Sequence, residues 1–557
     1  MRTAMTNKLS DVERIKTESR YLRGRLIDSL ADDITGAIHP DDTQVIKFHG
    51  SYQQDDRDIR AERQEQKLEP LYSFMLRVRM PGGVATPTQW LAMDELARTY
   101  GNNTLKLTTR QAFQLHGVLK RNLKSTIQKM NSVALDTIAA CGDINRNILC
   151  SATPEQSMVW QRVYEDVKAV AELLLPKTRA YHEIWLDGEK VEGSESEPIY
   201  GATYLPRKFK TAFVVPPVND VDVFAHDMGF IAVVENGELL GYNVTVGGGL
   251  GSTHGDKTTY PRLASTLGFI TPDKVLAVAE HIVTVQRDWG NRETRKWARL
   301  KYTIDRVGID AFKAEVEKRA NVVFAPTREF SFDTNTDRFG WTEGVNGTHH
   351  LTLRIEGGRV IDRPGELWLT GLREIAKVHR GDFRLTANQN LVIANVPSTQ
   401  RAAIDALVLR YGLNAYATFS ELRQRAIACV ALPTCSLAFA EAERYLPEFS
   451  QKIEALLQKN GLLHLPLHLR ITGCPNGCGR PWLSEIGLIG KAPGKYNLYL
   501  GGDQAGTRFN VLYKETLDEQ QILTELDGLI ARFARERKPQ ESFGDWVARN
   551  EIVTVAA

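Results

Sequence analysis

Long apolar segments and export signals are both missing from this sequence of 557 residues. No run of 18 or more apolar residues occurs, and a transmembrane helix needs a run of about that length. The first residues, MRTAMTNKLSDVERIK, contain no apolar stretch of the kind found in secretory signals. We therefore expect a cytoplasmic protein that does not associate with a membrane.

Cysteine and net charge are also scarce. The chain has six cysteines and a formal net charge of +2 at pH 7. Structural disulfides are rare in the cytoplasm, so we expect no disulfide framework. A near-neutral chain has no overall electrostatic attraction for nucleic acid, so we expect no such partner, and any anion site must come from local clusters. The remaining composition, 42% hydrophobic and 25% charged, is that of an ordinary globular protein with several cores.

Two distant parts of the chain share one order of features. In each, an alternating Arg-bearing segment leads to Gly-Gly, a helical segment follows, and a second strand carries a Leu-Thr pair and a Gln. The segments are LRVRMPGGV (76–84), PTQWLAMDELARTYG (87–101) and LKLTTRQ (105–111) in the first part, and LTLRIEGGRV (351–360), GELWLTGLREIAKVHRG (365–381) and FRLTANQ (383–389) in the second. A chance likeness of two α/β units is the alternative. We interpret the pattern as an internal duplication with a site between the halves.

A larger mixed segment follows each of these units, so the pattern predicts an α+β (mixed α/β) fold with pseudo-twofold symmetry. The acidic and basic stretch QQDDRDIRAERQEQKL (53–68) is most simply an exposed helix or linker without a chemical role. The predicted domains are an N-terminal extension (1–65), a first half-domain (66–135), a first larger domain (136–330), a second half-domain (340–405) and a second larger domain (415–557).

Four of the six cysteines lie close together in the sequence. Cys429 and Cys435 form a C-x5-C pair, and Cys474 and Cys478 form a C-x3-C pair within the turn-rich ITGCPNGCGRPW (471–482). SLAFAEAERYL (436–446) predicts a helix, which would place Cys435 at a helix N-terminus, where free amides stabilise a thiolate.

Three interpretations of these cysteines compete. They could be buried structural thiols, or they could bind zinc, although zinc sites usually have C-x2–4-C pairs. They could also hold an iron–sulfur cluster through four thiolates that come from two separate loops.

The spacing of these cysteines resembles the signature of the sirohaem-dependent sulfite and nitrite reductases. Over its whole length the chain resembles the haemoprotein β-components of NADPH-dependent sulfite reductases, from YLRG (21–24) and FHGSYQQDDRDIRAER (48–63) to GKAPGKYNLYLGG (490–502). The resemblance implies ferredoxin-like half-domains and two larger domains that bind sirohaem and a 4Fe–4S cluster. It also implies that Cys429, Cys435, Cys474 and Cys478 hold the cluster, with Cys478 as axial ligand of the sirohaem iron.

Basic residues form several local clusters that suit an oxyanion and a polycarboxylate macrocycle. In YLPRKFK, Lys208 and Lys210 point to the same face of an alternating strand, where two ammonium groups repel each other unless an anion lies between them. The resemblance implies that Arg77, Arg146, Lys208 and Lys210 hold the substrate. We expect the two lysines to have lowered pKa values and to act as proton donors.

Further residues are expected to contact the sirohaem. For His116, an ordinary structural histidine is an equal alternative. The run VGGGLG (246–251) does not match a nucleotide-binding fingerprint, so we expect no NADPH site and interpret it as a turn that lets the backbone approach the macrocycle. Cys141 and Cys150 are expected to be ordinary buried thiols. The expected sirohaem contacts are Lys106, Arg110, Gln114, His116, Arg207 and Asn476.

The resemblance implies a six-electron reduction of sulfite to sulfide in sulfur assimilation and cysteine biosynthesis. Electrons would come from NADPH through a separate flavoprotein α-component carrying FAD and FMN, in a hetero-oligomer, and the N-terminal extension could dock this partner. The alternatives are a ferredoxin-dependent sulfite reductase, a nitrite reductase, and a non-enzymatic iron–sulfur or zinc scaffold or sensor. The resemblance also implies that the two lysines of RKFK favour sulfite over nitrite.

Overall fold

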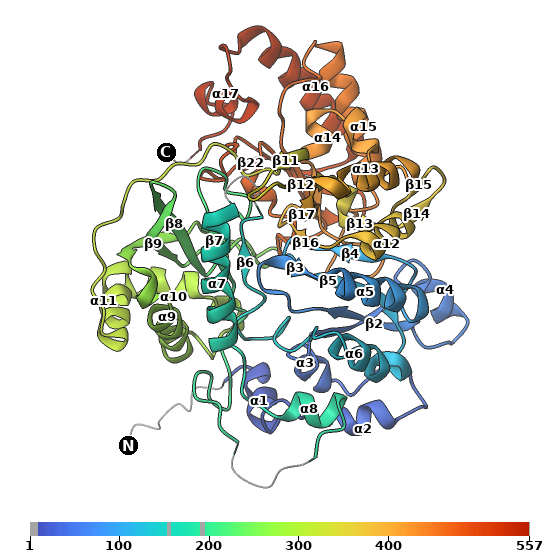
Figure 1. The fold of residues 1–557 in the computed structure, drawn as a ribbon, viewed down its shortest axis with the longest axis vertical. Coiled ribbons are helices and arrows are strands. Elements are labelled where there is room, and N and C mark those ends of the chain that lie inside the picture. Colours follow the sequence, from blue (N-terminus) through green and yellow to red (C-terminus); the bar gives the residue numbers. More distant parts are fainter. Residues whose placement is uncertain (1–8, 153–156, 190–194, 556–557) are drawn as a thin grey trace.

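Four five-stranded sheets, which form two matching pairs, organise the chain (Figure 1). The computed structural model describes residues 9–152, 157–189 and 195–555. In these ranges no helix combines the length and the apolar character needed to span a bilayer.

The first pair of sheets contains the two duplicated units, and each sheet borrows its last strand from the other unit. β3 pairs with β16, and β13 pairs with β4. The duplication predicted from the sequence is therefore present, and the two units are interlocked by a mutual exchange of strands. The first sheet runs β1 (Ser51–Asp55), β2 (Tyr72–Arg77), β5 (Phe113–Val118), β4 (Leu105–Leu107) and β13 (Arg359–Val360). The second runs β11 (Gly340–Glu343), β12 (Thr348–Leu353), β17 (Leu391–Pro397), β16 (Asp382–Leu385) and β3 (Val84–Ala85).

The Gly-Gly pairs lie where each chain crosses to the other sheet. Gly83 and Gly358 have φ angles of +71° and +68°, which favour glycine. A Cβ at Gly83 would press on the Leu385 carbonyl, and one at Gly358 would overlap the Leu107 carbonyl. The helices α5 (Pro87–Thr99) and α12 (Trp368–Val378) follow these crossings and pack against each other.

The shared glutamines connect each small unit to the next larger one. The Gln111 side chain donates to the carbonyls of Cys150 (2.8 Å) and Leu385 (2.9 Å). Gln389 donates in the same way to the Ala428 carbonyl at 2.8 Å. This common role explains why both units carry Gln a few residues after their Leu-Thr pairs.

The two larger units also have one topology. In each, three strands are parallel and two further strands are added antiparallel. The first sheet contains β6 (Leu149–Cys150), β7 (Thr211–Val214), β8 (Met228–Glu235), β9 (Glu238–Val246) and β10 (Ser265–Ile270), with α7 (Ser157–Leu173) and α9 (Val275–Trp289) beside it. The second contains β18 (Ile427–Ala428), β19 (Leu469–Thr472), β20 (Ile486–Ala492), β21 (Lys495–Leu500) and β22 (Val511–Leu517), with α15 (Leu446–Lys459) and α16 (Glu519–Glu536).

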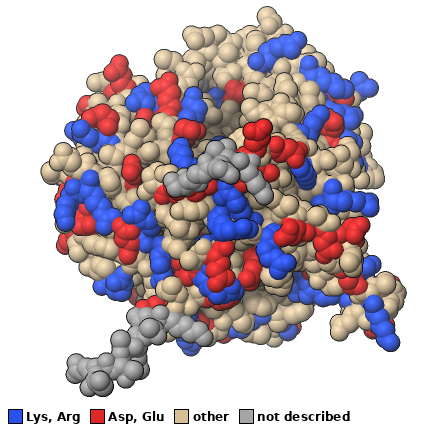
Figure 2. All heavy atoms as spheres, turned by 90° about the horizontal axis from the view of Figure 1, so that it is seen from below, with Lys and Arg blue, Asp and Glu red and all other residues tan. Residues whose placement is uncertain are grey.

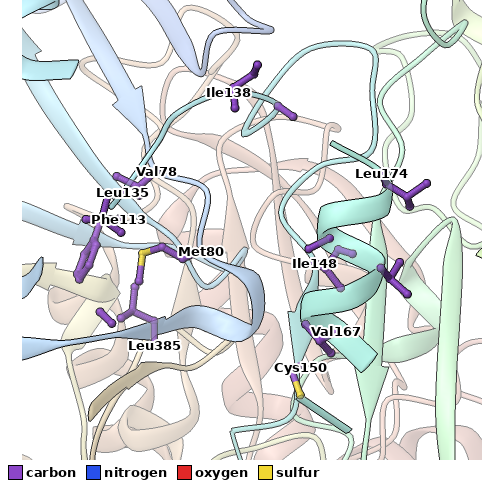
Figure 3. Close-up of a cluster of buried hydrophobic side chains, with 14 of the residues drawn as sticks. Val78, Met80, Phe113, Leu135, Ile138, Ile148, Cys150, Val167, Leu174 and Leu385 are labelled. Carbon is purple, nitrogen blue, oxygen red and sulfur yellow. The ribbon is translucent and has the colours of Figure 1, made fainter. Parts of the chain in front are cut away.

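One hydrophobic core joins both small units to the first larger unit, and a second core belongs to the unit with the cysteines. In Figure 3, Phe113 and Met80 of the first small unit lie near Leu385 of the second, and Cys150 lies beside Val167 of α7. Buried packing therefore continues across the predicted boundaries at 135/136 and 330/340.

The N-terminal extension is integrated into the first unit. It contains α1 (Asp11–Glu18), α2 (Leu26–Ala31) and α3 (Asp42–Val45), and its β1 forms the edge of the first sheet. Within the stretch 53–68 only α4 (Arg60–Glu65) is helical. Residues 1–8 of the predicted extension lie outside the described residues.

The helix predicted over residues 436–446 is wrong. Residues 436–445 form turns and bends, and helix α15 begins at Leu446. The backbone amides of Phe439 and Ala440 donate to the Gly473 carbonyl (2.8 and 3.2 Å) instead of to carbonyls within a helix. Burial of Ala438, Ala440 and Ala442 against the second core stabilises this irregular path, so tertiary contacts outweigh the helix propensity.

Candidate functional site

The sheet topology brings the two cysteine pairs together. Cys429 follows β18 directly and Cys474 follows β19 closely. β18 and β19 are neighbouring parallel strands, so their carboxyl ends share one edge of the sheet. The C-x5-C and C-x3-C loops therefore start side by side, and all four cysteines are free thiols.

Backbone and side-chain donors surround these thiols. The Cys429 sulfur accepts from the Gly473 amide (3.3 Å) and the Thr472 hydroxyl (3.4 Å). The Cys474 sulfur accepts from the Asn476 side-chain amide at 3.5 Å. The amides of residues 437 and 438 lie against the Cys435 sulfur. Such donors stabilise negative charge on sulfur, as a metal-bound thiolate requires.

The thiol pKa values place the four sulfurs in one group. Burial raises the pKa of Cys429 to about 12, and burial raises those of Cys435 and Cys474 to about 11. Interaction with the Cys478 thiol adds to all three shifts, so Cys478 lies among the others, and it alone of the four is exposed.

The donor set fits a 4Fe–4S cluster, which is held by four thiolates from protein loops. In the ranges that the structure describes, no three His, Cys, Asp or Glu side chains are grouped to hold a single metal ion. A four-iron cluster is larger than one ion and needs thiols that stand further apart.

Lys208 and Lys210 lie just before β7 and face this thiol group. Neither ammonium has a hydrogen-bond or ion-pair partner among the described residues, and both interact with the Cys478 thiol. Burial, with the nearby Arg207 and Arg299, lowers the pKa of Lys208 to about 7. Burial and the Lys208 charge hold the pKa of Lys210 well below its usual range, as the sequence predicted. Two neighbouring ammonium groups without protein partners form a site for an anion.

Arg77 and Arg146 border the same region. The Arg77 guanidinium donates to the Cys141 sulfur at 3.1 Å, and the Gln114 amide oxygen faces it when that amide is oriented to accept. Arg146 donates to the Gly142 carbonyl at 2.7 Å and lies against the Tyr52 hydroxyl. The sequence did not point to Tyr52 or to the contact between Cys141 and Arg77. The proximity of Cys141 to Arg146 in the sequence was the available signal.

Arg110 and Arg207 extend the basic region. Arg110 donates to the Asn147 carbonyl, and its buried Nε has no partner among the described residues. Burial, with Arg146 and Arg77, lowers the pKa of Arg110 to about 9. Burial and Arg295 lower that of Arg207 to about 10. An unpaired buried donor and cations with depressed pKa values fit the carboxylates of a macrocycle.

The other two residues expected to contact sirohaem are placed differently. The Lys106 ammonium donates to Glu443 at 2.6 Å and to the Gly357 carbonyl, so protein groups already occupy it. His116 is buried on β5 with an unpartnered Nδ1, and burial keeps its pKa well below the usual range.

The glycine run 246–251 packs against the protein backbone. The Ser252 amide donates to the Pro475 carbonyl at 2.9 Å, and a Cβ at Gly251 would approach the Asn476 carbonyl oxygen at 3.2 Å. A Cβ at Gly248 would overlap the Phe224 carbonyl. These glycines therefore let the chain support the C-x3-C loop closely.

On the face in Figure 2, Lys and Arg are interspersed with Asp and Glu. This face therefore carries both signs of charge and is not uniformly basic.

Comparisons with known proteins agree with this geometry. The nitrite/sulfite reductase ferredoxin-like half domain matches residues 66–133 and 343–411, which are the two small units. The nitrite and sulphite reductase 4Fe-4S domain matches residues 168–324, within the first larger unit and before the four cysteines. The predicted fold class is thereby confirmed.

Among full-length relatives, the sulfite reductase (NADPH) hemoprotein beta-component of Myxococcus xanthus DK1622 is 60% identical over 97% of this chain and 96% of its own length. Its namesake from Bacillus subtilis 168 is 56% identical over 98% of this chain and 96% of its own length. The solved structure of the Mycobacterium tuberculosis NirA protein superposes with a TM-score of 0.81 at 24% identity, covering 99% of this chain and 98% of that one. At that identity the likeness concerns the fold.

Proposed function

This chain belongs to the family of the sulfite reductase (NADPH) hemoprotein beta-components, and from this premise we propose that it reduces sulfite to sulfide in sulfur assimilation. Sulfur passes from the +4 to the −2 state, so the reaction consumes six electrons and also needs protons. A sirohaem coupled to a 4Fe–4S cluster supplies the electron-transfer chemistry when both are bound.

The four cysteines are proposed to hold the cluster, with Cys478 shared with the sirohaem iron. This assignment is supported by the common sheet edge and by the exposure of Cys478 toward the two lysines. Arg110, Arg207 and Asn476 are proposed to contact the sirohaem. Gln114 and His116 are proposed to support the residues that contact the sirohaem, because Gln114 faces Arg77 and His116 is buried. Lys106 is proposed to stabilise the site through its ion pair with Glu443.

The substrate is proposed to be held by Arg77, Arg146, Lys208 and Lys210. Their charges neutralise the oxyanion and favour weakening of its S–O bonds. Lys208 and Lys210 have lowered pKa values, so their ammonium groups give up a proton more readily than an exposed lysine does. They are proposed to protonate the departing oxygens, which leave as water.

Electrons are proposed to come from an NADPH-oxidising flavoprotein α-component with FAD and FMN, which forms a hetero-oligomer with this chain in the cytoplasm. The relatives' designation as beta-components supports a separate partner. The N-terminal extension, whose β1 forms the edge of the first sheet, is the proposed docking region.

The unpaired ammonium groups of Lys208 and Lys210 beside the Cys478 thiol are the observation that carries this proposal. The test is an absorption spectrum of the purified holoprotein before and after dithionite, then after sulfite, followed by turnover with a reduced viologen dye. We expect a Soret band that shifts with sulfite, and stoichiometric sulfide. A protein without such a spectrum, made with ample iron and sirohaem, would refute the proposal, and faster reduction of nitrite than of sulfite would reassign the substrate.

A further inference from the structure

Arg57 belongs to the stretch 53–68, for which the sequence predicted no chemical role. It lies against residues 429–445, the irregular segment that carries Cys435 and forms the Cys435 loop. Its backbone amide donates to the Pro433 carbonyl at 3.2 Å. One guanidinium nitrogen donates to the carbonyls of Cys435 (3.1 Å) and Ala438 (2.6 Å). Three carbonyls of this loop therefore point at one residue that lies far away in the sequence. We propose that Arg57 is a positioning residue that holds the Cys435 loop in the conformation that the iron–sulfur cluster requires.

The loop has no regular secondary structure that could hold it in place. Its amides at positions 439 and 440 donate to the Gly473 carbonyl, next to Cys474. Its carbonyls at 433, 435 and 438 face Arg57 on the other side. The loop is thus fixed by partners outside it, and Arg57 supplies the charged group that binds its carbonyls. An arginine that bonds several free carbonyls has the same stabilising role at the C-terminal ends of helices.

Arg57 is itself fixed by its surroundings. It follows β1, whose Asp55 pairs in register with Tyr72 of β2. Asp58 pairs with Arg444 at 2.6 Å and so joins the far end of the loop to the same segment. These contacts give the half-buried guanidinium a defined position.

The proposed consequence concerns the Cys435 sulfur. The amides of residues 437 and 438 face this sulfur, while the carbonyls of residues 435 and 438 face Arg57. The two carbonyls belong to the peptide units immediately before and after the two that carry these N–H groups, so the contact with Arg57 fixes the backbone on both sides of the N–H groups that face the sulfur. Hydrogen bonds to cluster sulfurs and a nearby positive charge both stabilise the reduced cluster and raise its reduction potential.

This inference rests on the proposed function, since it assumes that Cys435 is a cluster ligand. The test compares Arg57→Gln with Arg60→Gln in the full-length holoenzyme. Both variants lose one positive charge from the same stretch, but Arg60 contacts Asp55 and, among the described residues, has no hydrogen bond or ion pair with the loop. Arg57→Lys, which keeps the charge without the forked donor, is the conservative variant.

Two measurements do not depend on turnover: the midpoint potential of the cluster, by electron paramagnetic resonance, and the rate of iron release to a chelator. We expect Arg57→Gln to lower the midpoint potential and to speed iron release ~10-fold, as expected for the loss of a charged hydrogen bond. Arg57→Lys should give intermediate values, and Arg60→Gln should match the unsubstituted protein.

If Arg57→Gln folds and matches Arg60→Gln in both measurements, the inference is wrong although the proposed function stands. If Arg57→Gln does not fold, Arg57→Lys is compared with Arg60→Gln in the same two measurements, and equal values refute the inference. If the unsubstituted protein carries no iron or acid-labile sulfide under ample supply, the proposed function itself has failed. These results distinguish the two hypotheses.

Discussion

At the scale of single residues, the site depends on charges that the protein leaves unpaired. Most basic residues near it have protein partners: Lys106 pairs with Glu443, and Arg299 pairs with Asp227 at 2.6 Å. Lys208 and Lys210 do not have such partners among the described residues. Burial and the neighbouring cations lower their pKa values and prepare the site for an anion, whereas the Cys478 thiol acts in the opposite sense.

Lys210→Met should retain both cofactors but reduce sulfite turnover by ~100-fold or more, because it removes a proton donor and one charge that neutralises the oxyanion. The measurement is anaerobic sulfide production with a reduced viologen dye, together with iron content and the visible spectrum. The exposed Lys257 provides a control, and Lys257→Met should behave like the unsubstituted enzyme. Normal turnover by Lys210→Met would rule out the proposed role.

The pH dependence should report Lys208. Its pKa is lowered to about 7, so the ammonium is present below this pH and is lost as the pH rises through it. Lys208→Arg keeps its charge across this range. The titration of sulfite itself affects both proteins equally and cancels in their ratio.

We therefore expect the ratio of kcat/KM for sulfite, unsubstituted enzyme over Lys208→Arg, to fall as the pH increases from about 6 to about 8. A ratio that is constant with pH would contradict the assignment of this pKa to Lys208.

At the scale of elements, short strands and turns connect the units. β3 and β13 have only two residues each, yet each completes the sheet of the opposite unit. Each exchange passes through a Gly-Gly turn with no space for a side chain. The cysteine loops show the same principle, since partners outside them determine their conformation.

Gly358→Ala should destabilise the protein much more than Gly365→Ala. Both glycines have positive φ angles, of +68° and +81°, so both substitutions carry the conformational cost of about 1–2 kcal/mol. Only at Gly358 would the new Cβ overlap backbone, at the Leu107 carbonyl, whereas at Gly365 no atom lies within 4 Å. The clash should add roughly 1–3 kcal/mol.

Thermal unfolding measured side by side should place the apparent Tm of Gly358→Ala several degrees below that of Gly365→Ala. Equal Tm values would show that the strand exchange tolerates a side chain at this turn.

At the scale of the whole molecule, the duplicated architecture divides the chemistry between its halves. The first larger unit contributes Arg146, Lys208 and Lys210 from segments that precede β6 and β7. The second contributes the cysteines from segments that follow β18 and β19. Buried ion pairs hold the halves together. Glu443 of the cysteine unit binds Lys106 (2.6 Å) and Arg359 (2.7 Å), one from each small unit.

The ion pairs of Glu443 should make the stability of the protein depend on pH under acidic conditions. Although burial opposes ionisation, Arg359 and Lys106 lower the pKa of Glu443 to about 2, below its ordinary 4.5. This stabilisation is complete above about 4.5 and is lost as the pH falls toward 2, and it amounts to roughly 3 kcal/mol. Glu443→Gln should lower the apparent Tm at pH 7 and reduce the dependence of Tm on pH below 4.5. An unchanged Tm at pH 7 would contradict the stabilising role of these ion pairs.

The sequence alone determined the duplication and the fold class, and it pointed to the four cysteines and the paired lysines as candidate site residues. These features depend on local patterns: alternation along strands, paired glycines at turns, and the spacing of cysteines within a loop. The lowered pKa values of Lys208 and Lys210 were also expected, from their closeness to each other and to arginines, although burial is the largest cause of both shifts.

Only the tertiary structure decided the path of residues 436–445, the exchange of β3 and β13, the pairing of Lys106 with Glu443, and the contact of Arg57 with the Cys435 loop. The reason is that each depends on partners that are distant in the sequence. Local propensity favoured a helix after Cys435, but the Gly473 carbonyl accepts the amides, and Arg57 binds the carbonyls. No local pattern carries that information, because it arises only when the two halves pack together.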